Sequence, residues 1–472
     1  MTRRSKIVCT LGPASDRPRV LAGMIRAGLD VARINFSHGL PEEHRARVAA
    51  VRREARRAGR NVAILQDLQG PKLRLGVFAG GRVELAPGET VLLVARPGVV
   101  GSPRLIPVPL SSLARDCHPG HPVLLDDGRV RLRVKRSRGR DVECEVEVGG
   151  PVSDHKGVSL PGSPLSIPAF TPKDRRDAAL GRELGVDLVA MSFVRSGRDV
   201  ERARRHIGAG TPLIAKMEKP QAIQAMEEIL RAADGVMVAR GDLGVELPPE
   251  EVPAIQKDII RRSNLRGLPV IVATQMLNSM IEHPRPTRAE ASDVANAVYD
   301  GADALMLSGE SASGSYPVES VQMMERIILA AESAARTHGK APARIGGVTF
   351  PASFPDVISQ VACDAARTAG AVVIAAFTLS GHTARLLSHY RPAVPIVAFS
   401  PNQEVRRKLS LLWGVVPRVL EPVDRTEEMV RRVEEELLSR GFAHRGDRVV
   451  IVYGAPVGQP GKINSMRLHE IA

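Results

Sequence analysis

The sequence is poor in cysteine, in aromatic side chains and in long apolar runs. Its 472 residues include four cysteines and one tryptophan, and aromatic residues make up 3%. The cysteines lack the spacing of a metal site, which favours reduced thiols in a reducing compartment. They are Cys9, Cys117, Cys144 and Cys363. So few aromatic residues provide no stacking platform for single-stranded nucleic acid.

The chain also lacks any apolar run that approaches the length of a membrane span. Residues 1–6 lead only into a short apolar segment, which does not resemble a secretory signal. A hydrophobic content of 43% is typical of globular proteins. We therefore expect a cytoplasmic protein that binds no membrane, and a chain of this length predicts two to four domains.

A net charge of +14 and a pI near 10.1 raise the alternative of a nucleic-acid-binding protein, because phosphate contacts dominate such binding. Basic residues alternate with acidic ones along amphipathic segments such as residues 42–57. That mixture forms no single basic face. We therefore expect no nucleic-acid partner.

Strand-like apolar runs alternate with amphipathic helical patterns through most of the chain. The expected strands are residues 6–10, 30–36, 62–66, 187–193, 212–216, 235–239, 269–274 and 303–307. The expected helices between them are residues 17–27, 42–58, 172–184, 222–232, 252–265, 288–299 and 318–337. Eight alternating units predict a closed (β/α)8 barrel.

Two segments depart from this alternation. Residues 71–156 lose the helical period and read as short alternating strands bounded by Gly, Pro and Asp-Asp-Gly turns, which predicts an inserted all-β domain. After a linker at 339–347, alternation resumes and predicts an open α/β domain. The expected division is residues 1–70 and 157–339 for the barrel, 71–156 for an inserted lid and 340–472 for a C-terminal regulatory domain.

The most informative stretch places charge at the ends of two neighbouring apolar segments. Lys216 and Glu218 lie two residues apart, and Asp242 follows the next segment. Side chains two apart on a strand share a face, so Lys216 and Glu218 project together and Asp242 can face them. Carboxylate oxygens beside a fixed cation suit a hard divalent metal and the handling of phosphate or enolate oxygens. A structural salt bridge at a strand end is the alternative.

More polar residues follow the other expected strands, at the end where barrels of this class carry their active sites. They are Arg33, Asn35, Ser37, His38, Asp67, Ser192, Arg195, Thr274, Ser308 and Glu310. A single Ser or Thr here is equally explained by helix capping. The whole ring indicates a site for a metal and anionic oxygens. No Walker loop or dinucleotide fingerprint is present, so arginines and metal would have to hold any nucleotide.

Several ordered motifs resemble the pyruvate kinase family. They are SKIVCTLGPAS at 5–15, ARINFSHG at 32–39, KME at 216–218, ARGDL at 239–243, ATQML at 273–277, PTRAE at 286–290 and MLSGE at 306–310. The resemblance covers the whole expected barrel, and the inserted and C-terminal segments fall where that family has them. It implies phosphoryl transfer from phosphoenolpyruvate to ADP in glycolysis, giving pyruvate and ATP.

The resemblance also implies a cofactor and roles for single residues. Mg2+ or Mn2+ would be held by Glu218 and Asp242, and Lys216 would lie against the moving phosphoryl group. The substrate carboxylate would be bound by Thr274 and by the amides of Gly241 and Asp242. The enolate carbon would be protonated through water near Thr274, with Ser308 and Glu310 as a relay. The nucleotide and the transferring phosphates would be contacted by Arg33, Asn35, His38, Arg74 and Lys156. A cytoplasmic homotetramer is implied as well.

One departure from the family pattern concerns K+. Many members have an acidic residue in the loop that opens the inserted domain and a Thr among the K+ ligands. Here Lys72 stands at the acidic place and Leu68 at the Thr place. This resembles the branch of the family that needs no K+, with the ammonium of Lys72 as the substitute. A solvated hinge lysine is the alternative.

The loop at 378–385 opens a helix after an expected strand, and hydroxyls with free amides at such a place form an anion site. By the resemblance, Thr378, Ser380 and Thr383 would bind a sugar phosphate or nucleotide effector. Ordinary capping explains them equally well.

For the whole chain, the alternative enzyme is a metal-dependent lyase or aldolase acting on pyruvate enolates, which would not need Arg33, Arg74 or Lys156.

Overall fold

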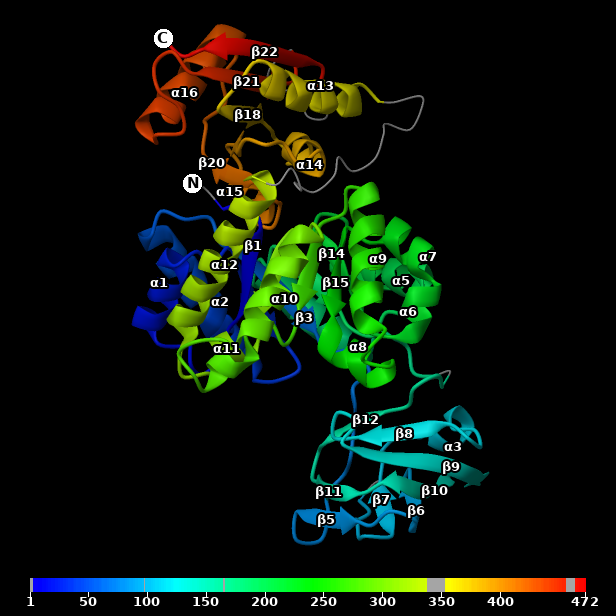
Figure 1. Cartoon of the computed structure of the whole chain (residues 1–472). Helices are drawn as coiled ribbons and strands as arrows, with labels where there is room; N and C mark the ends of the chain where they lie inside the picture. The colour runs from blue at the N-terminus through cyan, green and yellow to red at the C-terminus, as the bar shows by residue number, and fades with distance from the viewer. Residues whose placement is uncertain (1–2, 97, 164–165, 338–352, 456–462) are drawn as a thin grey trace.

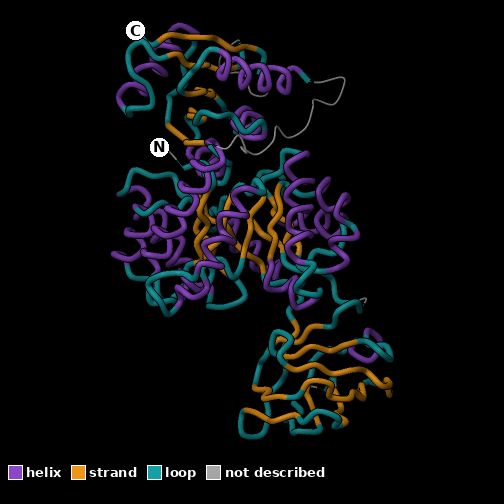
Figure 2. The backbone as a smooth tube through the Cα atoms, in the orientation of Figure 1, coloured by secondary structure: helices purple, strands orange, loops and turns teal. Residues whose placement is uncertain are grey.

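The computed structural model describes residues 3–96, 98–163, 166–337, 353–455 and 463–472. A closed barrel lies in the middle, a β-rich part lies at one end, and an open α/β sheet covers the other end (Figure 1). We keep the name lid for the β-rich part. The chain enters the lid from the third barrel strand and returns from it to the fourth, as the tube in Figure 2 shows.

Eight parallel strands close the barrel in the order β1-β17-β16-β15-β14-β13-β3-β2. They are β1 (Lys6–Thr10), β2 (Val31–Asn35), β3 (Ala63–Leu68), β13 (Leu188–Met191), β14 (Leu213–Met217), β15 (Gly235–Ala239), β16 (Val270–Ala273) and β17 (Ala304–Leu307). Almost every strand residue is buried, because helices cover the outside and side chains fill the inside. The predicted fold class is confirmed.

Helices surround the strands. They are α1 (Pro18–Arg26), α2 (Pro41–Arg57), α4 (Pro172–Glu183), α5 (Gly197–Ile207), α6 (Pro220–Gln224), α7 (Met226–Ala232), α8 (Arg240–Glu246), α9 (Val252–Leu265), η1 (Asn278–Ile281), α10 (Arg288–Tyr299), α11 (Gly309–Ala312) and α12 (Pro317–Thr337). The single helix expected at 222–232 is wrong: the chain leaves helical geometry at Ala225, so α6 and α7 are separate. The short helix α8, which follows β15 at once, was not expected.

The lid is built from β4 (Leu73–Arg74), β5 (Arg82–Leu85), β6 (Thr90–Val94), β7 (Leu105–Pro107), α3 (Leu113–Asp116), β8 (Pro122–Leu125), β9 (Val130–Arg138), β10 (Asp141–Val148), β11 (Gly150–Ser153) and β12 (Gly157–Ser159). Seven strands form one sheet, and β5 pairs with β11. Burial alternates along β5, β9 and β10, so the inward side chains build a separate apolar core.

The C-terminal part contains α13 (Phe354–Thr368), β18 (Val373–Phe377), α14 (His382–His389), β19 (Ile396–Phe399), α15 (Gln403–Leu409), β20 (Val415–Arg418), α16 (Thr426–Ser439), β21 (Arg448–Tyr453) and β22 (Ser465–Glu470). The sheet order is β20-β19-β18-β21-β22. Sequence reasoning missed β20, β22 and α15. Both strands are edges whose residues, apart from Val415, are half-buried or exposed, so they lack the apolar run that marks a central strand.

Four aspartates mark the amino-terminal ends of alternate barrel strands. Each directly precedes a strand and accepts a backbone N–H from the neighbouring strand at 2.7–2.9 Å. Each also pairs with an arginine side chain. The four are Asp30, Asp187, Asp234 and Asp303. These carboxylates hold the strands in register at this end, which we call the barrel floor.

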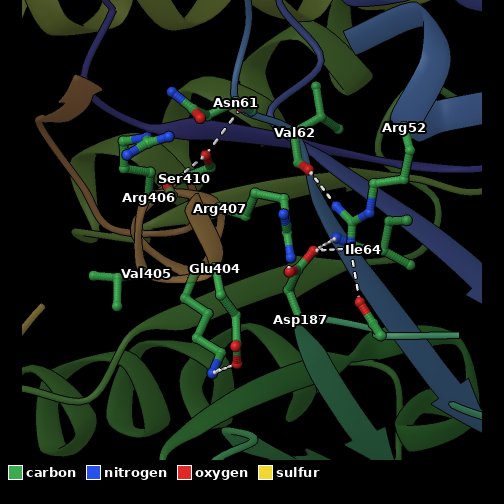
Figure 3. Close-up of polar contacts among 12 residues, drawn as sticks. Arg52, Asn61, Val62, Ile64, Asp187, Glu404, Val405, Arg406, Arg407 and Ser410 are labelled. Carbon is green, nitrogen blue, oxygen red and sulfur yellow. Dashed lines mark hydrogen bonds and ion pairs between the residues drawn. The ribbon is translucent and has the colours of Figure 1, made fainter. Parts of the chain in front are cut away.

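The C-terminal part docks on the barrel floor through two of these carboxylates, those of Asp187 and Asp303. Arg407 of α15 and Arg52 of α2 approach Asp187 from two sides, at 2.7 and 2.8 Å (Figure 3). Arg391 reaches Asp303 at 3.0 Å. Leu411 enters the apolar cluster inside the barrel. One side chain from the C-terminal part thus closes the floor, and two arginines fix its position.

Replacing Arg407 with methionine should destabilise the joint between the barrel and the C-terminal part by about 2 kcal/mol, because Asp187, fully buried, keeps only one of its two cations. Unfolding in urea measures this change in stability, and it can be followed by the fluorescence of Trp413, which lies two residues after Leu411. Arg431→Met removes an exposed pair with Glu435 and should shift stability by no more than about 0.5 kcal/mol. Equal midpoints for the two variants would contradict this account.

Candidate active site

The carboxyl ends of the barrel strands face the lid. In Figure 1, α8 and α11, which follow β15 and β17, lie at the end of the barrel nearest β12. The polar residues predicted to follow the strands therefore gather at this mouth, opposite the barrel floor. Within the described residues, no group of three or more His, Cys, Asp or Glu side chains is arranged to hold a metal by itself.

A chain of buried charges crosses the mouth from β2 to β14. Arg33 Nε donates to Asp67 Oδ2 at 2.6 Å, and Lys216 Nζ lies 3.3 Å from Asp67 Oδ1. Lys216 Nζ also donates to Ser192 Oγ at 2.8 Å and lies 2.8 Å from Glu218 Oε1. The side chains of Asp67 and Glu218 are each 1% exposed. The predicted neighbours Arg33, Lys216 and Glu218 are thus brought together.

Burial and neighbouring charge set the protonation of this chain. Burial alone would lower the pKa of Lys216, but the carboxylates of Asp67 and Glu218 raise it above its ordinary value. Burial alone would raise the pKa of Asp67, but Lys216 and Arg33 lower it. At neutral pH the site therefore presents two permanent cations around one ionised aspartate.

Glu218 and Asp242 fit a divalent cation. Glu218 Oε2 accepts the N–H of Phe193 at 2.7 Å, whereas Oε1 is buried and accepts no well-oriented hydrogen bond, despite its ion pair with Lys216. Among the described residues, no hydrogen bond or ion pair reaches the carboxylate of Asp242. Burial raises the pKa of Glu218, and the carboxylate of Asp242 raises it further. A buried and a half-buried carboxylate that each keep an oxygen without a hydrogen bond suit a hard metal ion.

Thr274 and Gly241 meet across the ends of β16 and β15. The Gly241 N–H donates to Thr274 Oγ1 at 2.7 Å. Thr274 and Gln275 both have positive φ, of 71° and 57°, a conformation that costs energy for residues other than glycine. Arg240 holds this turn, because one of its Nη atoms donates to the Thr274 carbonyl at 2.7 Å while the other binds Asp293.

Ser308 and Glu310 occupy the end of β17 in different ways. Glu310 is buried, and its carboxylate accepts the N–H groups of Leu277 at 3.0 Å and Ser308 at 2.7 Å. It therefore ties together the loops after β16 and β17. The Ser308 hydroxyl is buried and finds no hydrogen-bond partner within the described part of the chain. Of the expected relay, only Ser308 presents an unused hydroxyl.

Of the residues expected to contact nucleotide, His38, Arg74 and Arg33 lie in a basic cluster at the lid side of the mouth. Burial lowers the pKa of His38, and the charges of Arg74, Lys72, Arg33 and Lys173 lower it further. Arg74 is engaged with the His155 carbonyl at 3.0 Å. Lys156 pairs with Asp126 at 2.9 Å inside the lid. Asn35 Oδ1 accepts the Ser37 N–H at 3.1 Å.

The expected effector hydroxyls lie at the start of α14 and are not equivalent. Thr378 Oγ1 accepts the Gly381 N–H at 2.9 Å, and Thr383 Oγ1 lies 3.5 Å from the Phe377 carbonyl oxygen. Both threonines are buried and serve the turn itself. Ser380 is exposed and lines a cavity of about 240 Å3 together with His382, Arg385 and Lys408.

Two residues of the mouth were given no role by sequence reasoning. Asp67 was noted only for its place, although a carboxylate inside an otherwise apolar strand signals a buried charge pair. Arg240, beside the metal motif, carried no visible signal, because its contacts come from a helix far along the chain.

Comparisons with known proteins agree with one another. The family model for the pyruvate kinase barrel domain matches residues 2–321, and the model for the pyruvate kinase alpha/beta domain matches residues 356–469. The chain is 48% identical to a pyruvate kinase of Mycobacterium tuberculosis, across 100% of this chain and 99% of that protein. It is 46% identical to one of Corynebacterium glutamicum, across 99% and 98%. A crystal structure of a pyruvate kinase from Cryptosporidium parvum superposes with a TM-score of 0.92, at 34% identity, covering 100% of this chain and 96% of that one.

Proposed function

The chain belongs to the pyruvate kinase family, so it is a phosphotransferase that uses phosphoenolpyruvate and ADP, and we propose how its own residues perform the transfer. The observation that carries the proposal is the buried chain from Arg33 through Asp67 and Lys216 to Glu218, with Asp242 beside it. The relatives reported above are all kinases, so the lyase or aldolase alternative is dropped.

Glu218 and Asp242 would hold Mg2+ or Mn2+, with the substrate's oxygens completing the coordination. When bound, the cation would neutralise charge on the enolate and phosphoryl oxygens. The support is Oε1 of Glu218, which accepts no well-oriented hydrogen bond although it pairs with Lys216, and the carboxylate of Asp242, which is not paired with any other described side chain. Because two carboxylates alone do not fill the sphere of such an ion, substrate can enter it directly.

Lys216 and Arg33 would bind the phosphoryl group directly, in addition to the metal ion. Phosphoryl transfer is mostly positioning and charge neutralisation, and both are supplied by cations that are already fixed and desolvated. The Lys216 side chain is 9% exposed and held by Asp67 and Ser192, so it needs little rearrangement. Its raised pKa keeps the ammonium charged as the group passes.

The substrate carboxylate would lie against Thr274 and the amides of Gly241 and Asp242 in the first turn of α8, with the Gly241 N–H exchanging its present bond to Thr274 Oγ1 for one to the carboxylate. The enolate carbon would then face the end of β17. The unpartnered hydroxyl of Ser308 suits a water that delivers the proton. Glu310 would act by holding the two loops together, because both its oxygens accept backbone N–H groups.

ADP would lie between the mouth and the lid, on the basic cluster of Asn35, His38 and Arg74. Lys156 would join it by leaving its present pair with Asp126. We assign residues 71–156 to this lid, residues 1–70 and 157–339 to the barrel and residues 340–472 to the C-terminal domain. The junction near 340 lies outside the described residues.

Lys72 would replace K+. Among the described residues its ammonium makes no ion pair, and it lies close enough to His38 to affect its pKa. Leu68 is 1% exposed and offers no oxygen where a K+ ligand would be. Asp67 is already neutralised by two cations, which reduces its attraction for a third.

The C-terminal domain would carry the regulatory and assembly functions. Ser380, with the cations that line the 240 Å3 cavity, suits a sugar phosphate or a nucleotide.

One face of α13 exposes Phe354, Val357 and Val361 next to the unpaired edge of β22. A second copy of this chain would cover that face in a homotetramer, and a monomer in sedimentation at assay concentration would exclude it.

Among the described residues, no helix has both the length and the apolar character of a membrane span. A cytoplasmic location is proposed on the ground that the chain is a glycolytic kinase.

A coupled assay for pyruvate tests the mechanism. Pyruvate should form from phosphoenolpyruvate and ADP only when Mg2+ or Mn2+ is present. Lys216→Met should lower kcat about a hundredfold or more while KM changes little, because the ammonium acts mainly in the transition state. Glu218→Ala and Asp242→Ala should also lose divalent binding. Near-normal turnover of these variants would refute the assignments.

The K+ proposal predicts full activity with Mg2+ and a bulky organic cation as the only monovalent salt. Lys72→Glu should be slow and partly rescued by K+, since it removes the tethered charge and restores an acidic residue. The measurement is kcat against K+ concentration at constant ionic strength. Lys135→Glu, an exposed lid lysine, is the charge-matched control and should behave like the parent. Many-fold activation of the parent by K+ would show that Lys72 is no substitute.

The effector proposal is tested with a panel of sugar phosphates and nucleoside monophosphates. At least one should lower the apparent KM for phosphoenolpyruvate. Ser380→Asp should abolish that response by repulsion, whereas Ser380→Ala should only weaken it. Kinetics that no compound in the panel changes would remove the regulatory role.

A further inference from the structure

Lys219 is a second buried lysine at the mouth, and none of the steps above uses it. It follows Glu218 directly after β14 and is 6% exposed. A buried lysine is costly unless its charge is paired, so its contacts decide what it does.

The ammonium of Lys219 is held by a carboxylate at the end of α8 and by an aromatic ring in the loop after β13. Nζ lies 2.5 Å from Glu246 Oε1 at the end of α8, and the two side chains are 8% and 4% exposed. Nζ also lies 5.0 Å from the centre of the Phe193 ring, in a cation–π contact. Lys219 therefore connects the end of β14 with α8 and with the loop after β13.

Both partners of Lys219 lead back to the proposed metal ligands. Phe193, at a positive φ of 56°, donates its N–H to Glu218 Oε2 at 2.7 Å. Glu246 lies four residues after Asp242 on α8, one turn along the same helix face. Anchoring Glu246 therefore fixes the face of α8 that presents Asp242, and anchoring Phe193 fixes the orientation of Glu218.

Stability alone gives a weak reason for such a pair. The cost of removing two charges from water about equals or exceeds their attraction, and apolar residues of the same size would serve as well or better. An ion pair does fix distance and direction more tightly than apolar packing. The Lys219–Glu246 pair therefore fixes the distance and direction between the end of α8 and the segment that follows β14.

We propose that Lys219 is a positioning residue that sets the separation of Glu218 and Asp242, and with it the affinity for the divalent cation. The proposal rests on the metal site proposed above. The pair also borders a cavity of about 30 Å3 that is shared with Lys72 and Asp127 of the lid side, so it lies where the lid meets the metal site.

The role is tested by direct Mn2+ binding to the whole enzyme without substrate, measured by the electron paramagnetic resonance of free Mn2+. The direction in which the affinity changes distinguishes positioning from a simple charge effect. Lys219→Met removes a positive charge near the metal, so charge alone would tighten binding. Loss of positioning would weaken it instead, and we expect about a tenfold rise in Kd. Unchanged or tighter binding overturns the proposal.

Two further variants separate positioning from general damage. Glu246→Gln should weaken Mn2+ binding as Lys219→Met does, and the double variant should be no weaker than either, because both remove one connection. Additive losses would overturn the shared role. The midpoint of thermal unfolding should stay within about 3 °C of the parent, which corresponds to about 1 kcal/mol or less.

Controls distinguish failure of this inference from failure of the metal site. Lys135→Met breaks an exposed lid pair with Glu145 and should leave Mn2+ affinity unchanged. Glu218→Gln should abolish binding; if it binds as the parent does, the metal site itself is wrong. If Glu218→Gln abolishes binding and Lys219→Met does not alter it, the site stands and the positioning role falls. In turnover, Lys219→Met should raise the Mg2+ requirement while kcat at saturating Mg2+ falls less than about threefold.

Discussion

The mouth of the barrel depends on one buried carboxylate, that of Asp67. Arg33 and Lys216 come from strands on either side of it, and without an anion between them their charges would repel each other at short range. Asp67 holds both at fixed distances and keeps the pKa of Lys216 high although the lysine is buried. A substrate rich in negative charge therefore meets cations that are already desolvated and oriented, and the cost of placing them was met when the protein folded.

The two ends of the barrel use aspartate and glutamate for different purposes. At the floor, each of the four aspartates accepts a hydrogen bond from a backbone N–H and forms an ion pair with an arginine. These contacts fix the strand register and, at Asp187, the docking of the C-terminal part. At the mouth, Glu218 keeps one oxygen without a well-oriented hydrogen bond, and Asp242 keeps its carboxylate unpaired among the described residues. Satisfied carboxylates hold structure, and unsatisfied ones are available for chemistry.

The sequence was a good guide to the barrel because eight apolar runs with helical spacing leave few other folds, and each run predicts where its strand ends. Lys216, Glu218 and Arg33 meet as expected for that reason. The partner of each charge was not predictable in the same way: Asp67 and Arg240 act through residues that are distant in sequence. Edge strands such as β20 and β22 were missed because they bury little. For Lys156, the sequence indicated a phosphate contact, whereas its partner in the structure is Asp126 of the same inserted segment, 30 residues away in sequence.

Leu411 has a consequence for how the protein is made. The last barrel strand ends at Leu307, yet the side chain that fills the barrel floor comes from the loop after α15, near the end of the chain. During synthesis the eight strands leave the ribosome well before their floor can be closed, with apolar side chains exposed at the open end. A product truncated before Leu411 would keep every side chain of the proposed active site and still lack a finished barrel core. The barrel floor is thus closed only in a chain that extends at least as far as Leu411.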